Sequence, residues 1–379
     1  MVVGVRKSIV KGLIWGRIIW LALRAYRNPR QTTVALRRLL AQRAKTQRWT
    51  TGKFVHAGGR YFWHLYAPGF PSRAFDAFVE RELDRVESFR DAPPALQTAV
   101  FAITKRCSFR CEHCCEWLAL NALETLAVAD LHAIVARVRA RGASQIFLSG
   151  GEPLRRFEDL VSIIGPASVD ADVWILSTGH GLTAERARRL RAAGLTGIAL
   201  SLDHWDPQQH DGFRGIDGAF RWVERAAEQA RGAGLLVALS LCPTREFTSR
   251  GNIERYAAVA RRLGAGFIQL FEPKAIGHYA GRNVVLSPDQ QELLEAFSLR
   301  LNTDPELREL PAVSYLEASA RASQCVGAGN RHIYIDTDGM VNPCPFCRSP
   351  AGRVLDGDFD ATLECMQVSG CPATTSAAH

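Results

Sequence analysis

The stretch Cys107-Ser-Phe-Arg-Cys111-Glu-His113-Cys114 contains three thiols, at spacings of four and three residues. These side chains can converge on one point if the backbone loops around it. Three thiolates are one fewer than the set that closes a structural zinc site or a fully ligated iron–sulfur cluster. The stretch therefore indicates a metal centre with an open coordination position. Cys115 follows directly, but adjacent side chains diverge, so we do not expect it to complete the set.

The chain around this loop alternates short apolar runs with helical patterns. The expected strands cover residues 99–104, 145–149, 173–177, 197–203, 235–241 and 267–271. Helical spacing occurs between them, near 128–142, 183–193, 219–231 and 252–263. Continuous apolar strands that alternate with helices predict an α/β fold with a parallel sheet covered by helices. Six such units favour an open, partial (β/α)6 TIM-like barrel over a closed eightfold one.

Polar and glycine residues follow the ends of several expected strands. The cysteine stretch follows the first strand, and Gly150-Gly151-Glu152-Pro153 follows the second. Thr178 follows the third strand, while Ser201 and Asp203 end the fourth. Function gathers beyond the carboxyl ends of parallel strands, so we expect all of these residues to line one rim.

Cys-x3-Cys-x2-Cys after a first strand, with Gly-Gly-Glu-Pro after a second, resembles the radical S-adenosylmethionine (radical SAM) enzymes over residues 97–275. The resemblance implies that Cys107, Cys111 and Cys114 hold a 4Fe–4S cluster whose fourth iron binds S-adenosylmethionine. It also implies reductive cleavage to a 5′-deoxyadenosyl radical, which takes hydrogen from a substrate C–H bond. The chain would then be an oxidoreductase or maturase.

The same resemblance implies a set of S-adenosylmethionine-binding residues. These are His113 beside the adenine; Gly150, Gly151 and Glu152 at the methionyl amino group; Ser201 and Asp203 at the ribose or carboxylate; and Thr178 in the same cleft. Four further polar residues after the fourth strand could reach a substrate: His204, His210, Asp211 and Arg214. No catalytic side chain is assigned.

The C-terminal part carries a second group of cysteines around an expected hairpin at 331–343. Cys325, then Gly339, then a cysteine five positions later resembles the SPASM and twitch auxiliary-cluster domains. The resemblance implies one auxiliary 4Fe–4S cluster, held by Cys325, Cys344, Cys347 and Cys371. Cys371 is preferred to Cys365, which falls in a helical pattern with Phe359, Leu363 and Met366 and is expected to be buried packing. Cys242, on an apolar strand, is expected to be a core residue.

Zinc is the alternative for the first cysteine group. Cys111 and Cys114 could join Cys344 and Cys347 in a four-cysteine site, and a zinc-stabilised nucleic-acid-binding protein would follow from that. Because the pairs lie far apart in the sequence and no nucleic-acid module surrounds them, a nucleic-acid partner is disfavoured.

The charge of the chain is concentrated at its N-terminus. The net charge is +9, but residues 1–60 contain 14 Lys or Arg and no Asp or Glu. The other 319 residues carry 47 − 14 = 33 basic and 38 acidic residues, a net of −5. Ten clustered cysteines without a cleavable secretory signal favour metal binding in a reducing compartment, and thus a cytoplasmic location.

Residues 9–26 are rich in Ile, Leu and Trp, but Lys11, Arg17 and Arg24 interrupt them. The uncharged stretches are far shorter than the roughly 20 residues that a spanning helix needs. A basic, Trp-bearing helix is typical of a peripheral segment on an anionic membrane surface, here the inner face. The alternatives are a helix that docks on the body or on a second subunit, and a basic patch for RNA.

Four regions are expected. Residues 1–52 form the basic helical segment, 53–94 a hairpin and helix, 95–285 the partial barrel, and 286–379 the auxiliary-cluster region. Gly58-Gly59 marks the hairpin turn, Ser72 caps the helix, and Pro93-Pro94 ends the second region.

Two substrate classes are expected. Enzymes with such auxiliary domains often modify ribosomally made peptides, so a peptide is the first expectation. A lipid or other membrane-associated substrate is the alternative, which the basic N-terminus would help to reach. A reducing partner such as flavodoxin or ferredoxin would supply electrons.

Overall fold

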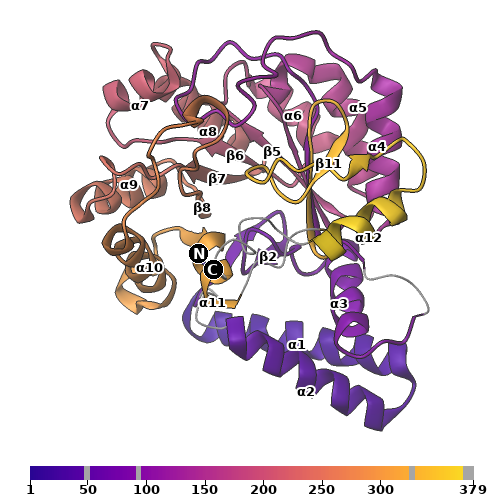
Figure 1. Cartoon of the computed structure of the whole chain (residues 1–379). Helices are drawn as coiled ribbons and strands as arrows, with labels where there is room; N and C mark the ends of the chain where they lie inside the picture. The colour runs from indigo at the N-terminus through magenta and orange to yellow at the C-terminus, as the bar shows by residue number, and fades with distance from the viewer. Residues whose placement is uncertain (47–51, 91–94, 324–328, 370–379) are drawn as a thin grey trace.

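A ten-stranded sheet forms the centre of the computed structural model, which describes residues 1–46, 52–90, 95–323 and 329–369 (Figure 1). The six expected strands are confirmed. They are β3 (Thr98–Ala102), β4 (Gln145–Ser149), β5 (Asp172–Ser177), β6 (Gly197–Ser201), β7 (Leu236–Leu241) and β8 (Phe267–Leu270), and they pair in parallel in chain order.

Two further parallel strands extend this set beyond the expected six units. β9 (Ala312–Tyr315) pairs with β8, and β10 (His332–Ile335) pairs with β3. β11 (Met340–Asn342) and β12 (Gly352–Arg353) then continue antiparallel from β10. The sheet has β12 and β9 at its edges and does not close, so it is an open, partial TIM-like barrel.

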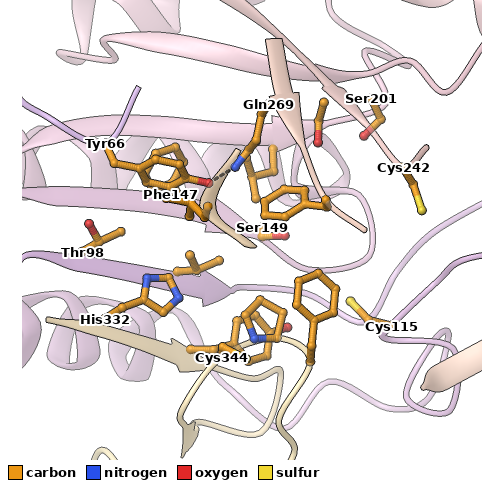
Figure 2. A pocket seen from close by; sticks show the side chains of 18 of the residues that line it. Tyr66, Thr98, Cys115, Phe147, Ser149, Ser201, Cys242, Gln269, His332 and Cys344 are labelled. Carbon is orange, nitrogen blue, oxygen red and sulfur yellow. Dashed lines mark hydrogen bonds between the residues drawn. The ribbon is translucent and has the colours of Figure 1, made fainter. Parts of the chain in front are cut away.

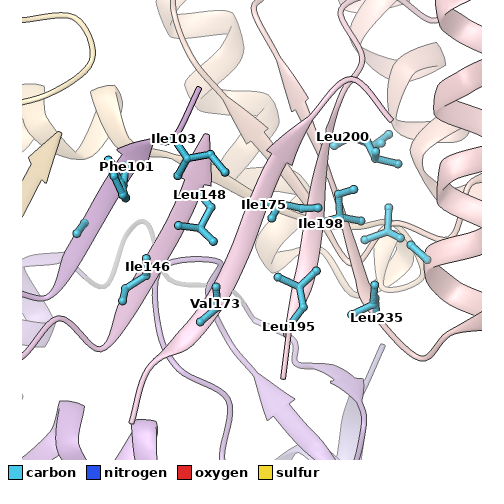
Figure 3. Close-up of a cluster of buried hydrophobic side chains, with 14 of the residues drawn as sticks. Phe101, Ile103, Ile146, Leu148, Val173, Ile175, Leu195, Ile198, Leu200 and Leu235 are labelled. Carbon is cyan, nitrogen blue, oxygen red and sulfur yellow. The ribbon is translucent and has the colours of Figure 1, made fainter. Parts of the chain in front are cut away.

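The helices between the strands cover the outer face of the sheet. They are α4 (Val128–Ala140), α5 (Phe157–Ala167), α6 (Ala184–Ala192), α7 (Pro207–Arg214), α8 (Ala219–Gly232), α9 (Arg250–Arg262) and α10 (Pro288–Thr303). Two short helices follow, α11 (Leu316–Ser323) and α12 (Phe359–Ser369). Figure 3 shows the core between sheet and helices, where Ile146, Ile175 and Ile198 lie together. Burial on both faces explains why these strands read as continuous apolar runs.

The expected hairpin is also confirmed, as β1 (Val55–Ala57) and β2 (Arg60–Phe62) around a Gly58-Gly59 turn. It packs on the inner face of the sheet, where Phe62 joins a cluster with Phe147 and Trp174. Arg60 forms an ion pair with Asp172, which lies at the start of β5. The hairpin therefore covers the amino ends of the strands and leaves the carboxyl ends for a functional site.

The N-terminal helices form a separate layer (Figure 1). α1 (Gly4–Tyr26), α2 (Pro29–Thr46) and α3 (Arg73–Val86) share one hydrophobic cluster, and the Ser72 hydroxyl caps α3 as expected. The Arg17 Nε donates to Asp76 Oδ1 at 2.9 Å, and Arg24 pairs with Glu80 at 3.1 Å. Among the described residues, no helix is long and apolar enough to cross a membrane. Pro93-Pro94 lies outside the described residues.

Candidate functional site

The carboxyl ends of the strands open onto a cavity of about 660 Å³. Most of the predicted site residues line it: Cys107, Cys111, His113, Cys114, Gly150, Gly151, Thr178, Ser201, Asp203 and Cys344. Figure 2 shows side chains from the sheet, such as Ser201 and Gln269, together with Cys115 and Cys344 around this space. The sequence therefore brings together, in one place, residues that lie up to 237 positions apart (344 − 107).

Hydrogen bonds to the Asn121 side chain and to the end of α7 hold the cysteine loop in place. The Cys107 amide donates to Asn121 Oδ1 at 3.0 Å, and the Arg110 amide donates to the Arg214 carbonyl at 3.1 Å. Burial raises the pKa of the Cys107 thiol to about 11 and also raises that of Cys114. These thiols are therefore protonated at neutral pH unless a metal ion displaces their protons.

The described residues contain no group of three or more His, Cys, Asp or Glu side chains already arranged around one metal position. The three thiols line the cavity together. The assignment of Cys107, Cys111 and Cys114 as metal ligands stays a prediction.

Gly150 and Gly151 pack directly against the cysteine loop. Gly150 has a φ of +134°, and a Cβ on it would lie 2.5 Å from the Thr104 carbonyl oxygen. A Cβ on Gly151 would lie 2.5 Å from the Arg106 carbonyl oxygen and 3.0 Å from the Cys107 Cβ. Only glycine allows this approach. The glycine pair therefore fixes the distance between the loop after β4 and the thiols.

Glu152 is buried and anchors the same loop. Its carboxylate accepts hydrogen bonds from the Ser177 hydroxyl at 2.7 Å, the Thr178 amide at 2.8 Å, the Thr178 hydroxyl at 2.5 Å and the Leu154 amide at 3.1 Å. Glu152 is not among the described residues that line the cavity. Its contact with a methionyl amino group stays a prediction, while its bonds to Thr178 tie the ends of β4 and β5 together.

His113 lies in the cavity wall as a neutral ring. It stacks on Phe213, with centroids 5.0 Å apart and planes 23° apart. Burial lowers the pKa of His113 to about 4. Its Nδ1 is buried and has no hydrogen-bond partner among the described residues. A flat, neutral ring with an unused nitrogen suits the expected place beside an aromatic ligand.

Arg214 belongs to the site, although sequence reasoning predicts only that it follows the fourth strand and could reach a substrate. Its buried guanidinium pairs with Asp203 and donates from Nη1 to Cys111 Sγ at 3.4 Å. Burial opposes ionisation of Asp203, but the Arg214 charge outweighs it and lowers the pKa of that carboxyl. The only signal in the sequence was its position after the fourth strand.

The other three polar residues of that loop bond to backbone amides. His210 Nδ1 accepts from the Asp203 amide, and His204 Nδ1 accepts from the Asp206 amide. The Asp211 carboxylate accepts from the amides of Gly218 and Phe220 at the start of α8. These side chains shape the loop.

The C-terminal segment touches the cysteine loop from the side. Arg348 donates to the Cys115 carbonyl at 3.3 Å and pairs with Glu116, which also accepts from the Tyr334 hydroxyl. The Cys347 amide donates to the Cys344 carbonyl at 3.2 Å, so both cysteines lie in one tight turn after β11. Cys325 and Cys371 lie outside the described residues.

Two expectations about single cysteines can be checked. Cys242 is buried, as expected, but it follows the end of β7 and lines the cavity, where its amide donates to Asp203 Oδ1 at 3.0 Å. Cys365 was expected to be buried and is exposed instead. In α12 the buried face is formed by Phe359, Leu363 and Met366. Cys365 comes directly before Met366, so its side chain points about 100° away from that of Met366.

The donor set fits an iron–sulfur cluster with a bound nucleoside ligand. Three thiols and the His113 ring line one cavity, and the glycine pair brings the loop after β4 into close contact with Cys107. A partial TIM-like barrel with such a rim defines a class of enzymes that use S-adenosylmethionine and a cysteine-bound cluster.

The comparisons agree with this class. The family model of the radical SAM superfamily matches residues 101–245. The chain is 30% identical over 252 residues to the PqqA peptide cyclase of Streptomyces rochei, covering 64% of this chain and 67% of that one. The chain belongs to the radical SAM superfamily. Its membership implies a 4Fe–4S cluster and S-adenosylmethionine as cofactors.

Two further similarities, one in sequence and one in structure, have lower sequence identity. The AdoMet-dependent heme synthase of Nitratidesulfovibrio vulgaris is 23% identical over 296 residues, covering 72% of this chain and 80% of that one. The structure of Streptococcus suis SuiB bound to the precursor peptide SuiA superposes with a TM-score of 0.57 at 13% identity. That match covers 71% of this chain and 65% of SuiB.

Proposed function

We propose that this radical SAM enzyme modifies a peptide substrate by taking hydrogen from one of its C–H bonds. Cys107, Cys111 and Cys114 hold the cluster, and the observation that carries the proposal is their place with Gly150 and Gly151 on one cavity wall. When bound, the cluster supplies one electron to S-adenosylmethionine and so gives the radical that removes hydrogen.

The chain itself positions these groups. Gly150 and Gly151 let the loop after β4 approach the thiols, and Glu152 holds that loop against β5. Arg214 places a positive charge beside Cys111 and Asp203. Further S-adenosylmethionine contacts come from a set on the same rim: His113, Gly150, Gly151, Glu152, Thr178, Ser201 and Asp203.

A peptide is favoured because the Streptomyces relative, at 30% identity, is named for a peptide substrate. A cavity of about 660 Å³ has room for one side chain of a peptide as well as the nucleoside ligand. Electrons come from a reducing partner such as flavodoxin or ferredoxin.

The proposal is tested by following hydrogen from the peptide into 5′-deoxyadenosine. Reconstituted protein, reductant and S-adenosylmethionine are incubated with a deuterated precursor peptide encoded beside the gene, and 5′-deoxyadenosine is analysed by mass spectrometry. Deuterium in the 5′-deoxyadenosine and a modified peptide support the proposal. Cleavage of S-adenosylmethionine with no deuterium transfer from any peptide tested would contradict the peptide substrate while leaving the enzyme class intact.

We also propose one auxiliary 4Fe–4S cluster, with Cys325, Cys344, Cys347 and Cys371 as ligands. Its support is the turn that holds Cys344 beside the cavity and Cys347 next to it. Iron is counted in Cys371→Ala and, as the matched control, in Cys365→Ala. Loss of about four iron atoms per chain in Cys371→Ala alone supports the ligand set. Unchanged iron in Cys371→Ala rejects it.

A lipid-like substrate is the second candidate, and a specific observation favours it. The cavity continues from the rim toward the N-terminal helices, where Leu39 of α2, Trp63 and Phe78 of α3 line it with apolar surface. A long apolar chain would fill this part better than a peptide backbone, whose amides need partners. Deuterium transfer from a labelled isoprenoid or acyl chain, with none from a peptide, would favour this candidate.

The four regions of the chain are part of the proposal: 1–52, 53–94, 95–285 and 286–379. The last region shares the central sheet with the barrel through the pairing of β10 with β3. We therefore expect it to unfold together with the barrel.

A further inference from the structure

α1 presents two apolar faces, and within the part of the chain that the structure describes one of them is packed and the other is exposed. Val10, Ile14 and Ile18 are buried against α2 and α3. On the opposite side Val5, Ile9, Leu13, Trp20 and Leu23 are exposed, and the first three are 79%, 59% and 58% accessible. Their spacing of four residues from Val5 to Leu13 puts them on one stripe of the helix.

Exposed large apolar side chains are concentrated in this part of the molecule. The described residues include 15 of them, and nine lie within the first 40 residues: Met1, Val5, Ile9, Leu13, Ile19, Trp20, Leu23, Val34 and Leu40. Scattered single residues are normal on a protein surface, whereas a contiguous apolar stripe on one helix marks an interaction surface.

The charges around the stripe have one sign. Residues 1–60 contain no Asp or Glu, and the acids that reach α1 come from α3, where Asp76 and Glu80 pair with Arg17 and Arg24. Arg6 is exposed at the edge of the stripe and has no ion-pair partner in the described parts of the chain. The surface therefore combines apolar area with unneutralised positive charge.

Trp20 stands between two cations on the same surface. The Arg17 guanidinium carbon lies 4.2 Å from the Trp20 ring centroid, and that of Arg24 lies 5.2 Å away. Tryptophan with neighbouring arginines is suited to the region between lipid head groups and acyl chains, because the ring is apolar with one polar edge.

We propose that the exposed stripe of α1 docks flat on an anionic lipid membrane. The apolar side chains enter the interface while Arg6, beside the stripe, contacts a lipid phosphate. A second copy of the chain fits this surface less well, because residues 1–60 offer no acidic side chain that could pair with Arg6 across the contact. The proposal does not depend on the substrate.

The test measures co-sedimentation of the full chain with phosphatidylcholine vesicles, with and without phosphatidylglycerol. Ile9→Asp with Leu13→Asp should weaken binding to the anionic vesicles at least tenfold, because both side chains enter the interface. Val169→Asp changes an exposed apolar residue of the body and should bind as the wild type does. Neither change touches the cavity, so cleavage of S-adenosylmethionine in solution stays unchanged.

A second pair of variants tests the charge. Arg6→Gln should weaken anionic-vesicle binding about fivefold, since a basic residue near the surface contributes about 1 kcal/mol. Arg188→Gln removes one exposed charge from the body and should change binding less than twofold.

Three results would overturn the proposal. They are equal binding to neutral and anionic vesicles, no binding to either, and a dimer in solution that Leu13→Asp converts to a monomer without any vesicle binding by the wild type.

Discussion

The cysteine loop of residues 107–114 and the C-terminal turn with Cys344 and Cys347 face the same cavity but are built differently. The loop carries its whole expected ligand set locally, and the glycine pair and Arg214 pack around it. The turn offers two cysteines and depends on distant residues for the rest. A ligand set that is local in sequence can be assigned from spacing, whereas a dispersed set needs the fold and then a measurement.

The largest expected effect separates the two regions directly. Cys111→Ala should abolish formation of 5′-deoxyadenosine, because two thiolates do not hold the cluster. Cys347→Ala should lose only the auxiliary iron and still cleave S-adenosylmethionine. Liquid chromatography of 5′-deoxyadenosine and iron analysis check both, with Cys242→Ala as a control that keeps all iron. Full activity in Cys111→Ala would reverse the roles given to the two regions.

Arg214 is expected to stabilise the cysteine loop through its buried ion pair with Asp203. Arg214→Gln leaves the buried Asp203 carboxylate unpaired, which should cost about 3–5 kcal/mol of unfolding free energy. Urea denaturation of the apoprotein measures it. Arg189→Gln breaks the exposed pair with Glu158 and should leave stability unchanged. Equal midpoints for the two variants would show that the Asp203–Arg214 pair does not stabilise the fold.

A substitution at Gly151 tests whether the loop after β4 must approach the thiols closely for S-adenosylmethionine to bind. Gly151→Ala should weaken S-adenosylmethionine binding by the reconstituted protein about tenfold, or about 1.4 kcal/mol, because its Cβ would push against Arg106 and Cys107. Equilibrium dialysis gives the affinity. Gly251→Ala, on α9 with open space around it, is the matched control. If both variants bind S-adenosylmethionine equally well, the close approach of Gly151 to the cysteine loop is not needed for binding.

The smallest expected effect concerns Glu317 on α11, which faces the cavity from the C-terminal side. Burial raises the pKa of Glu317 from 4.5 to about 7. The folded chain therefore binds this proton more tightly than the unfolded chain, and the stabilisation is complete below the unfolded pKa.

The stabilisation that comes from protonated Glu317 is lost as the pH rises through about 7. Denaturant unfolding between about pH 5 and pH 8 should show a steeper loss of stability in the wild type than in Glu317→Gln. Parallel pH profiles would mean that Glu317 ionises freely and that the cavity is open to water there.

The six central strands and the cysteine loop could be predicted because their signals are local: apolar runs of four to six residues and cysteines four and three positions apart. The pairing of β10 with β3 could not, because it joins segments 234 residues apart (332 − 98). The part played by Arg214 depends in the same way on contacts across the cavity. The exposure of Cys365 was within reach of the sequence, since its helical phase differs from that of Leu363 and Met366.

The central claim is that S-adenosylmethionine binds at the cluster held by Cys107, Cys111 and Cys114. Electron paramagnetic resonance of the reduced, reconstituted protein, recorded before and after addition of S-adenosylmethionine, tests it most directly. We predict that the cluster signal shifts on addition, because the ligand binds the iron that has no cysteine, and that Cys111→Ala shows no such shift. An unshifted signal in the wild type, or a colourless protein that binds zinc in place of iron, would contradict the account.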